Sequence, residues 1–351
     1  MTTRHKPDSL LRLAALLRRD YDRVGSYLAM EKAITKLTQT IVDRRKLQQI
    51  VDHTSVAITF AQLEALDRYL SEHYRAPLAT LFECPNALGS LVARGQVRIL
   101  LGSQPRRDER RIDLSRWDTR AMHEVFVGIN KISGSVRLDV VDGVYTPPAK
   151  AETCAELGMR QGWGDAFTDD GPSLIGIGSP RANLAAEVML ADMFGVRPFC
   201  RPEEPLPFGF VWSPVKGKQQ SSAFAAAAPD SQLAKAVAAG KKWALLIRGR
   251  PHPLDLFVPR STTYGVLAVQ RRRGGQVWMV LAGLSGPGTY AAAQFVGDAK
   301  LRVPASVGGE HSSVCWMTVR AEVEARATPG DDREVVRVES LTPSEVWDRP
   351  L

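Results

Sequence analysis

The first 85 residues carry apolar side chains at the spacing of amphipathic helices, and Gly25 is the only glycine in residues 8–82. A leading helix is predicted from apolar residues at every third or fourth position, namely Leu10, Leu13, Leu17 and Tyr21, which Tyr27 and Leu28 can extend. A later helix, FAQLEALDRYLSEHY, carries Leu63, Leu66 and Leu70 on one side. The pattern predicts an all-helical N-terminal domain over residues 1–85.

Two short helices around a tight turn are predicted within residues 33–60. Their inner faces consist of five apolar residues, Ile34, Leu37, Ile41, Leu47 and Ile50. Thr59 and Gln62 have the spacing of a capping box, so that a further helix is expected to begin directly after this pair.

The second of these short helices opens with a cationic, amide-rich segment. Asp43 is placed to cap it, and Arg44, Arg45 and Lys46 follow at once. Two glutamines come one turn later, at positions 48 and 49. Cations suit phosphate oxygens, and guanidinium or amide groups suit the edges of bases. This end of the helix therefore has the chemistry of a DNA-contacting surface.

In the order of its helices, the segment resembles a Cro/C1-type (XRE-like) helix-turn-helix DNA-binding domain. The resemblance covers the N-terminal region only. It implies a recognition helix, sequence-specific binding of double-stranded DNA and a role as a transcription regulator. The residues that it implies at the DNA are Thr38, Thr40, Arg44, Arg45, Lys46, Gln48 and Gln49. The alternative is a plain helical bundle with a solvated Arg-Arg-Lys face.

The charge of the chain favours a polyanionic partner or an anionic ligand. Its formal net charge is +8. Residues 1–85, however, contain 13 Lys and Arg against 10 Asp and Glu, while a stronger local excess of arginine lies at 106–111. DNA affinity is therefore expected to need a dimer, a second basic surface, or both.

After residue 85 short apolar runs alternate with helical patterns. Strands are predicted at 97–101, 136–141, 174–177, 243–247, 264–269 and 277–281, and helices at 119–131, 183–194 and 289–296. Such alternation predicts an α/β sheet with helices on its faces. The whole chain is thus expected to be α+β and multidomain, with a helical domain at 1–85 and an α/β region at 86–351. Within that region 86–205 and 241–340 can form two lobes, joined by a loose connection at 206–240 that contains one helix.

Three of these strands run into similar glycine turns, ILLGSQPRRDERR, LIGIGSPRANLAAEVML and VLAGLSGPGTYAAAQFV. Glycine lets a ligand approach the backbone, and the free N–H groups at the start of a helix favour an anion. Ligands of open α/β sheets gather at the carboxyl ends of the strands. A small anionic ligand, nucleotide- or sugar-phosphate-like, is expected there. The candidate residues are Gly102, Ser103, Arg106, Gly178, Ser179, Arg181, Asn183, Glu187, Gly283, Ser285, Gly286, Gly288 and Thr289. The alternative is that these glycines only build sharp turns.

An enzyme is the second class of function that the pattern allows. Glu187 follows Asn183 by one helical turn, so that both can face one ligand. A carboxylate in that place can act as nucleophile or base at a glycosidic bond, as in a nucleotide-directed hydrolase or transferase of a defence system whose N-terminus binds a partner. A pure interaction protein is the third. Because the six histidines are dispersed and no nucleophile elbow occurs, no catalytic residue is assigned and the regulator is preferred.

The remaining signals concern cysteines and membranes. Four scattered cysteines, Cys84, Cys154, Cys200 and Cys315, predict free thiols, no structural metal and no cofactor. The chain has no apolar run of about 20 residues and no signal-peptide pattern, so no membrane partner is expected and a reducing cytoplasm is the simplest setting. A homodimer that binds palindromic half-sites is the expected assembly.

Overall fold

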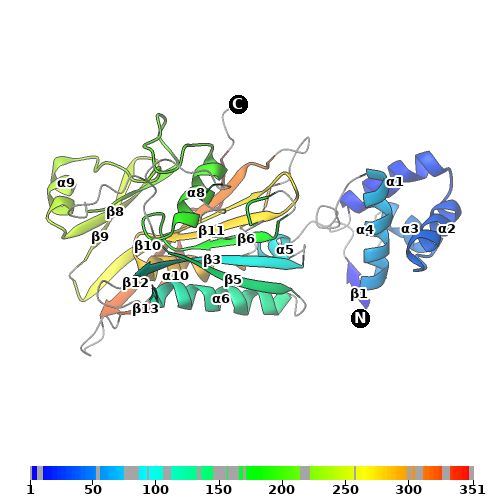
Figure 1. Cartoon of the computed structure of the whole chain (residues 1–351), viewed down its shortest axis with the longest axis horizontal. Helices are drawn as coiled ribbons and strands as arrows, with labels where there is room; N and C mark the ends of the chain where they lie inside the picture. Colours follow the sequence, from blue (N-terminus) through cyan, green and yellow to red (C-terminus); the bar gives the residue numbers. More distant parts are fainter. Residues whose placement is uncertain are drawn as a thin grey trace. The chain divides into compact units, whose positions relative to one another are not determined.

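The structure, a computed structural model, describes residues 2–5, 11–52, 56–74, 87–92, 95–105, 112–132, 136–144, 156, 166–168, 171–213, 222–256, 258–298, 301, 303–304, 311–325 and 333–347. The chain is a mixed α+β protein and divides into two compact units, Met1–Pro85 and Asn86–Leu351 (Figure 1). The division falls at the residue where the apolar pattern changes from helical to mixed.

The N-terminal unit consists of four helices and a small sheet in its described part. Its elements are β1 (Thr2–His5), α1 (Leu11–Val24), α2 (Tyr27–Thr38), α3 (Arg44–Val51), β2 (Val56–Thr59) and α4 (Phe60–Tyr74). β1 and β2 pair in antiparallel fashion, with Thr2 opposite Thr59 and His5 opposite Val56. The prediction of an all-helical domain was therefore wrong. The burial of Val56 and Ile58 on either side of an exposed Ala57 is the alternation of a strand.

The predicted pair of short helices is confirmed as α2 and α3. The leading helix ends before Gly25, whose φ of 85° breaks it, and Ser26 Oγ then caps α2 by accepting from Ala29 N at 3.2 Å. Tyr27 and Leu28 thus begin a new helix and do not extend the first. α2 ends at Gln39, in the left-handed region, and Asp43 Oδ1 caps α3 by accepting from Arg45 N at 2.6 Å.

The core of this unit follows the predicted apolar positions with one exchange. Ile34, Leu47 and Ile50 are buried and Leu37 is partly buried, but Ile41 is 63% exposed. The neighbouring Val42 is fully buried in its place, because the turn between the two helices directs position 42 toward the core. The predicted capping box is confirmed: Gln62 N donates to Thr59 Oγ1, and Thr59 N donates to Gln62 Oε1.

The C-terminal unit contains all six predicted strands and all three predicted helices. Its described elements are α5 (Ala87–Val92), β3 (Gln96–Pro105), β4 (Ile112–Leu114), α6 (Arg116–Ile132), β5 (Arg137–Val144), β6 (Ser173–Ile177), α8 (Leu184–Phe194), β7 (Phe208–Val211), α9 (Ser231–Ala238), β8 (Lys242–Ile247), β9 (Arg250–Asp255), β10 (Arg260–Arg271), β11 (Val277–Gly283), α10 (Gly286–Ala293), β12 (Val314–Ala325), β13 (Arg333–Ser340) and β14 (Glu345–Trp347). None of the helices in the described ranges is long and apolar enough to cross a membrane.

Nine described strands form one mixed sheet in the order β13-β12-β10-β11-β6-β3-β4, with β5 also paired to β3 and β14 to β12. β5, β3, β6 and β11 run parallel, and the other pairs are antiparallel. Strands from both 86–205 and 241–340 thus share a single sheet and do not form two lobes. The chain leaves β3 toward β5 on one side and later enters β6 on the other, so the strand order reverses between β3 and β6.

Helices cover both faces of this sheet (Figure 1). α5, α6 and α10 pack on one face, against side chains such as Ile99 and Leu101 of β3. α8 packs on the other face, which receives the alternate residue Leu100. The face beneath α8 also carries a three-stranded sheet, β7-β8-β9.

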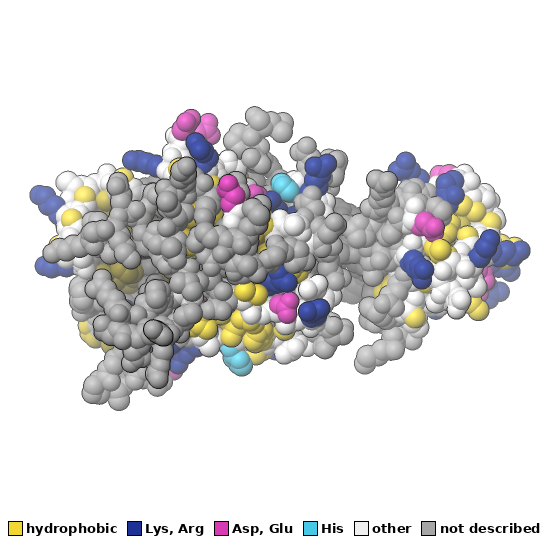
Figure 2. All heavy atoms as spheres, in the orientation of Figure 1, with side chains coloured by type: hydrophobic (Ala, Val, Ile, Leu, Met, Phe, Trp, Pro, Cys, Tyr) yellow, Lys and Arg dark blue, Asp and Glu magenta, His cyan; other side chains and the backbone are white. Residues whose placement is uncertain are grey.

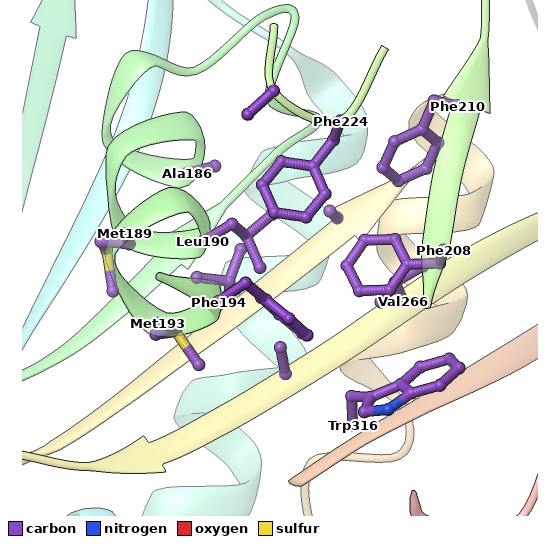
Figure 3. Close-up of a cluster of buried hydrophobic side chains, with 14 of the residues drawn as sticks. Ala186, Met189, Leu190, Met193, Phe194, Phe208, Phe210, Phe224, Val266 and Trp316 are labelled. Carbon is purple, nitrogen blue, oxygen red and sulfur yellow. The ribbon is translucent and has the colours of Figure 1, made fainter. Parts of the chain in front are cut away.

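An aromatic cluster joins that small sheet to α8 (Figure 3). Phe208 of β7 lies between Phe194 of α8, at 5.4 Å between ring centroids, and Phe224, stacked at 5.2 Å. Trp316 of β12 closes the cluster at 5.6 Å from Phe208. The predicted loose connection at 206–240 therefore contains, in its described part, a core strand as well as the expected helix.

Candidate functional sites

The outer face of α3 carries four of the seven side chains that the sequence assigned to DNA. Leu47, Ile50 and Val51 are buried against the N-terminal core, which turns the opposite side of the helix to solvent. That side carries exposed side chains in two adjacent rows, Arg44 with Gln48 and Arg45 with Gln49. Basic side chains are visible on the surface of this unit in Figure 2.

The flanking residues are held by contacts within the unit. Lys46 Nζ donates to Gln62 Oε1 at 2.8 Å, and Arg44 N donates to Glu31 Oε2 at 3.0 Å. Thr38 Oγ1 donates to Ile34 O and accepts from Thr40 N, so it closes the end of α2. Arg44, Arg45, Gln48 and Gln49 form the exposed polar surface. Lys46 and Thr38 position the helix.

The second candidate site is the β3–β6 edge, the carboxyl ends of these two strands, where the strand order reverses. The turns after β3 and β6 meet there: a Cβ built at Gly102 would lie 2.9 Å from Asn183 Cβ, and one at Gly178 would lie 3.3 Å from the same atom. Gly178 N also donates to Leu281 O of β11 at 2.9 Å. The first two glycine turns therefore converge at the carboxyl edge of the sheet, which is where the ligand was predicted.

Asn183 holds the β3–β6 edge together. Its Nδ2 donates to Leu100 O at 3.0 Å and to Ile177 O at 2.9 Å, and its Oδ1 accepts from Ala185 N at 2.9 Å. One buried side chain thus ties the ends of β3 and β6 together and caps α8. Since both ends of the amide are engaged within the protein, Asn183 has a structural role at the β3–β6 edge.

The first turn of α6 reaches the same edge from the other face of the sheet. Asp118 Oδ2 lies 3.4 Å from the Cβ position of Gly178, whose φ of 124° suits glycine alone. The neighbouring Trp117 packs against Gly286 of the third turn and lies 5.9 Å from the Tyr290 ring. All three glycine turns are thereby linked, the third of them through α6.

Asp118 is a buried carboxyl group. It is 6% exposed, no described residue donates a hydrogen bond to it, and desolvation by burial raises its pKa to about 7. Sequence reasoning did not select it. Ser115 and Asp118 have the spacing of a capping box, and that pattern predicts an ordinary helix start.

The third turn packs closely against the sheet. The backbone of α10 at Gly288 lies against Tyr264 O, so that any side chain there would overlap β10. Ser285 Oγ and Thr263 Oγ1 are 2.7 Å apart, and Thr289 is buried. Gly283 also lies against the start of the helix. Packing of the third turn against the sheet therefore explains why these residues occur in it.

Glu187 is buried, and both of its carboxylate oxygens accept hydrogen bonds from the chain. It is fully buried; Oε1 accepts from Phe199 N and Ala223 N, both at 2.8 Å, and Oε2 accepts from Ser222 Oγ at 2.6 Å. Burial raises the pKa of this carboxyl against the lowering effect of these three hydrogen bonds. The contacts give Glu187 a structural role and do not bring it to the β3–β6 edge as a ligand group or nucleophile.

The remaining predicted ligand residues lie in different places. The Arg181 guanidinium lies 5.9 Å from the ring centroids of both Trp212 and Trp243, which directs it toward the small sheet. Ser179 is half-buried in the second turn. Arg106 lies outside the described residues. Of the cysteines within those residues, Cys200 and Cys315 form no disulfide, as predicted.

No protein-family model matches the chain, and no curated protein is significantly similar to it. Its function must therefore be argued from these two sites.

Proposed function

We propose that the protein is a sequence-specific DNA-binding transcription regulator. Its N-terminal unit would be a Cro/C1-type helix-turn-helix domain with α3 as the recognition helix. The observation that carries the proposal is the exposed polar face of α3, with two arginines and two glutamines in adjacent rows and the other face buried. The amide and guanidinium groups suit base edges, and the arginines also suit phosphates.

The C-terminal unit supplies the regulatory half of the proposal. A small ligand, nucleotide- or sugar-phosphate-like, would bind at the β3–β6 edge, or the unit would mediate assembly. A ligand that binds one of two states more tightly changes DNA affinity by that difference. A cytoplasmic homodimer that reads palindromic half-sites about one DNA turn apart completes the proposal.

The contacts of Glu187 remove the basis of the enzyme alternative. That alternative needed a carboxylate that faces a ligand, whereas both oxygens of Glu187 accept hydrogen bonds from the chain. No other observation on the described residues favours it over a regulator.

The double substitution Arg44→Ala with Arg45→Ala is expected to weaken DNA binding. The full-length protein would first be used to select duplexes from a random pool. The dissociation constant of the selected duplex would then be measured by fluorescence anisotropy at several salt concentrations. Each lost phosphate contact lowers the slope of log K against log salt by about 0.9, so a reduction of one to two units is expected. Enrichment of no sequence from the pool would overturn the proposal.

The matched control removes one exposed cation from α4 of the same unit. Arg68→Ala should leave the slope of the selected duplex unchanged, because α4 lies outside the recognition helix. A loss of slope in the control half as large as that of the double variant, and so equal for each removed cation, would mean that general charge, and not α3, holds the DNA. Gln48→Ala with Gln49→Ala should instead reduce the preference for the selected sequence over a scrambled one, with little change in the slope.

A further inference from the structure

An isoleucine side chain is exposed in the turn between α2 and α3. Ile41 is 63% exposed, the largest exposed fraction of any large apolar side chain among the described residues. The next residue, Val42, is fully buried, so the two side chains of this turn face opposite ways. Covering an apolar side chain with a partner removes it from water, which favours association. Ile41 is therefore a candidate contact that the exposed polar face of α3 does not include.

The backbone at Ile41 is fixed beside the first turn of α3. Gln62 Nε2 of α4 donates to Ile41 O at 3.0 Å, and Gln62 Oε1 accepts from Lys46 Nζ of α3 at 2.8 Å. One amide side chain thus joins the turn to the helix, and the buried Val42 anchors the turn on its other side. A side chain on such a fixed backbone has less conformational freedom to lose when it binds a partner.

The start of α3 is unsuited to the phosphates of DNA. Glu31 Oε2 accepts from Arg44 N at 3.0 Å, and Asp43 Oδ1 accepts from Arg45 N at 2.6 Å. Two carboxylates therefore occupy the backbone N–H groups that bind an anion at other helix starts. In a helix-turn-helix domain the N-terminal residues of the recognition helix lie over the edges of the bases. The turn that carries Ile41 would thus face the floor of the major groove.

The major groove offers one apolar group to such a side chain, the C5-methyl group of thymine. We propose that Ile41 packs against a thymine methyl group and so helps to determine the DNA sequence that the protein binds. This inference rests on the DNA-binding half of the proposed function. It adds to the arginines and glutamines of α3 a contact that distinguishes thymine without a hydrogen bond.

The test uses the full-length protein and the duplex that it selects from the random pool. Each thymine of that duplex is replaced in turn by uracil, which keeps the base pair and removes only the methyl group. Fluorescence anisotropy then gives the dissociation constant of each duplex. The wild-type protein is expected to bind about fourfold more weakly when the contacted methyl group is missing, which is the effect of one buried methyl group.

Substitutions at position 41 connect this effect to the isoleucine. Ile41→Ala is expected to bind the thymine and uracil duplexes equally well, because the shortened side chain does not reach the methyl group. Ile41→Val keeps a branched side chain and should retain a preference for thymine of about twofold. Leu28→Ala is the matched control: Leu28 is 44% exposed at the other end of α2, so its removal should leave the wild-type preference unchanged. Both positions are exposed, so none of these variants should unfold.

Two outcomes would overturn the inference and leave the regulator proposal standing. In the first, the wild-type protein binds equally well whichever thymine is replaced. In the second, Ile41→Ala loses affinity for the thymine and uracil duplexes by the same factor, which would assign Ile41 to a contact between two copies of the chain. A pool that yields no selected sequence would instead overturn both proposals together.

Discussion

Replacing Asn183 by alanine is expected to lower the free energy of unfolding of the C-terminal unit by about 3–4 kcal/mol. The substitution removes three buried hydrogen bonds at once. It deprives Leu100 O and Ile177 O of a donor and leaves α8 without its cap, which alone is worth about 1 kcal/mol. Against a total stability of roughly 5–15 kcal/mol, such a loss is large.

Urea unfolding followed by tryptophan fluorescence measures this effect. All seven tryptophans of the chain lie after residue 85, so the signal reports the C-terminal unit. Asn130→Ala, on the exposed surface of α6, is the matched control and should cost less than about 0.5 kcal/mol. A loss in the free energy of unfolding below about 1 kcal/mol for Asn183→Ala would contradict the role of this side chain in joining the ends of β3 and β6.

The second large effect is a dependence of stability on pH that comes from Asp118. Its pKa rises from 3.8 to about 7 on folding, because burial desolvates the charged form. The folded chain therefore binds this proton more tightly than the unfolded chain does. The stabilisation that comes from this raised pKa is fully present below about pH 4 and is lost as the pH rises through about 7. At about 1.4 kcal/mol per pKa unit, the whole effect is roughly 4 kcal/mol.

Asp118→Asn removes this ionisation, so the variant should gain stability relative to the wild type as the pH rises. Urea unfolding at about pH 5 and pH 8 gives the difference in the free energy of unfolding between the variant and the wild type. This difference should grow by roughly 2–3 kcal/mol in favour of the variant between the two pH values. Glu204→Gln, which removes one exposed negative charge from the same unit, controls for net charge. A gap that stays constant with pH would mean that Asp118 ionises as readily in the folded chain as in the unfolded one.

The sheet was predictable because its strands are short, continuous apolar runs. β6 and β11 are buried at every residue, and such runs separated by helical patterns have few other interpretations. β1 and β2 escaped prediction because each is four residues long and its partner is more than 50 residues away. β7 escaped for a related reason, since its FGFV segment precedes an alanine-rich stretch without the period of a strand.

The location of the candidate site at the β3–β6 edge was predictable from the sequence, but the roles of its side chains were not. The rule that ligands meet the carboxyl ends of strands located the first two turns correctly, since Gly102 and Gly178 lie against one asparagine. The roles of individual side chains depended on distant contacts. Glu187 is satisfied by residues 12 to 36 positions later, and Asp118 is buried by a turn 60 residues away. No local pattern encodes such distances.

The contacts of Glu187 also bear on the dynamics of the two segments that it joins. The amides of Phe199 and Ala223 share one acceptor oxygen, although they belong to segments 24 residues apart. Neither segment can detach without disturbing the acceptor of the other. Both amides should therefore exchange their hydrogens through one common opening, with the same protection. A single buried carboxylate thus makes two segments of the chain behave as one cooperative unit.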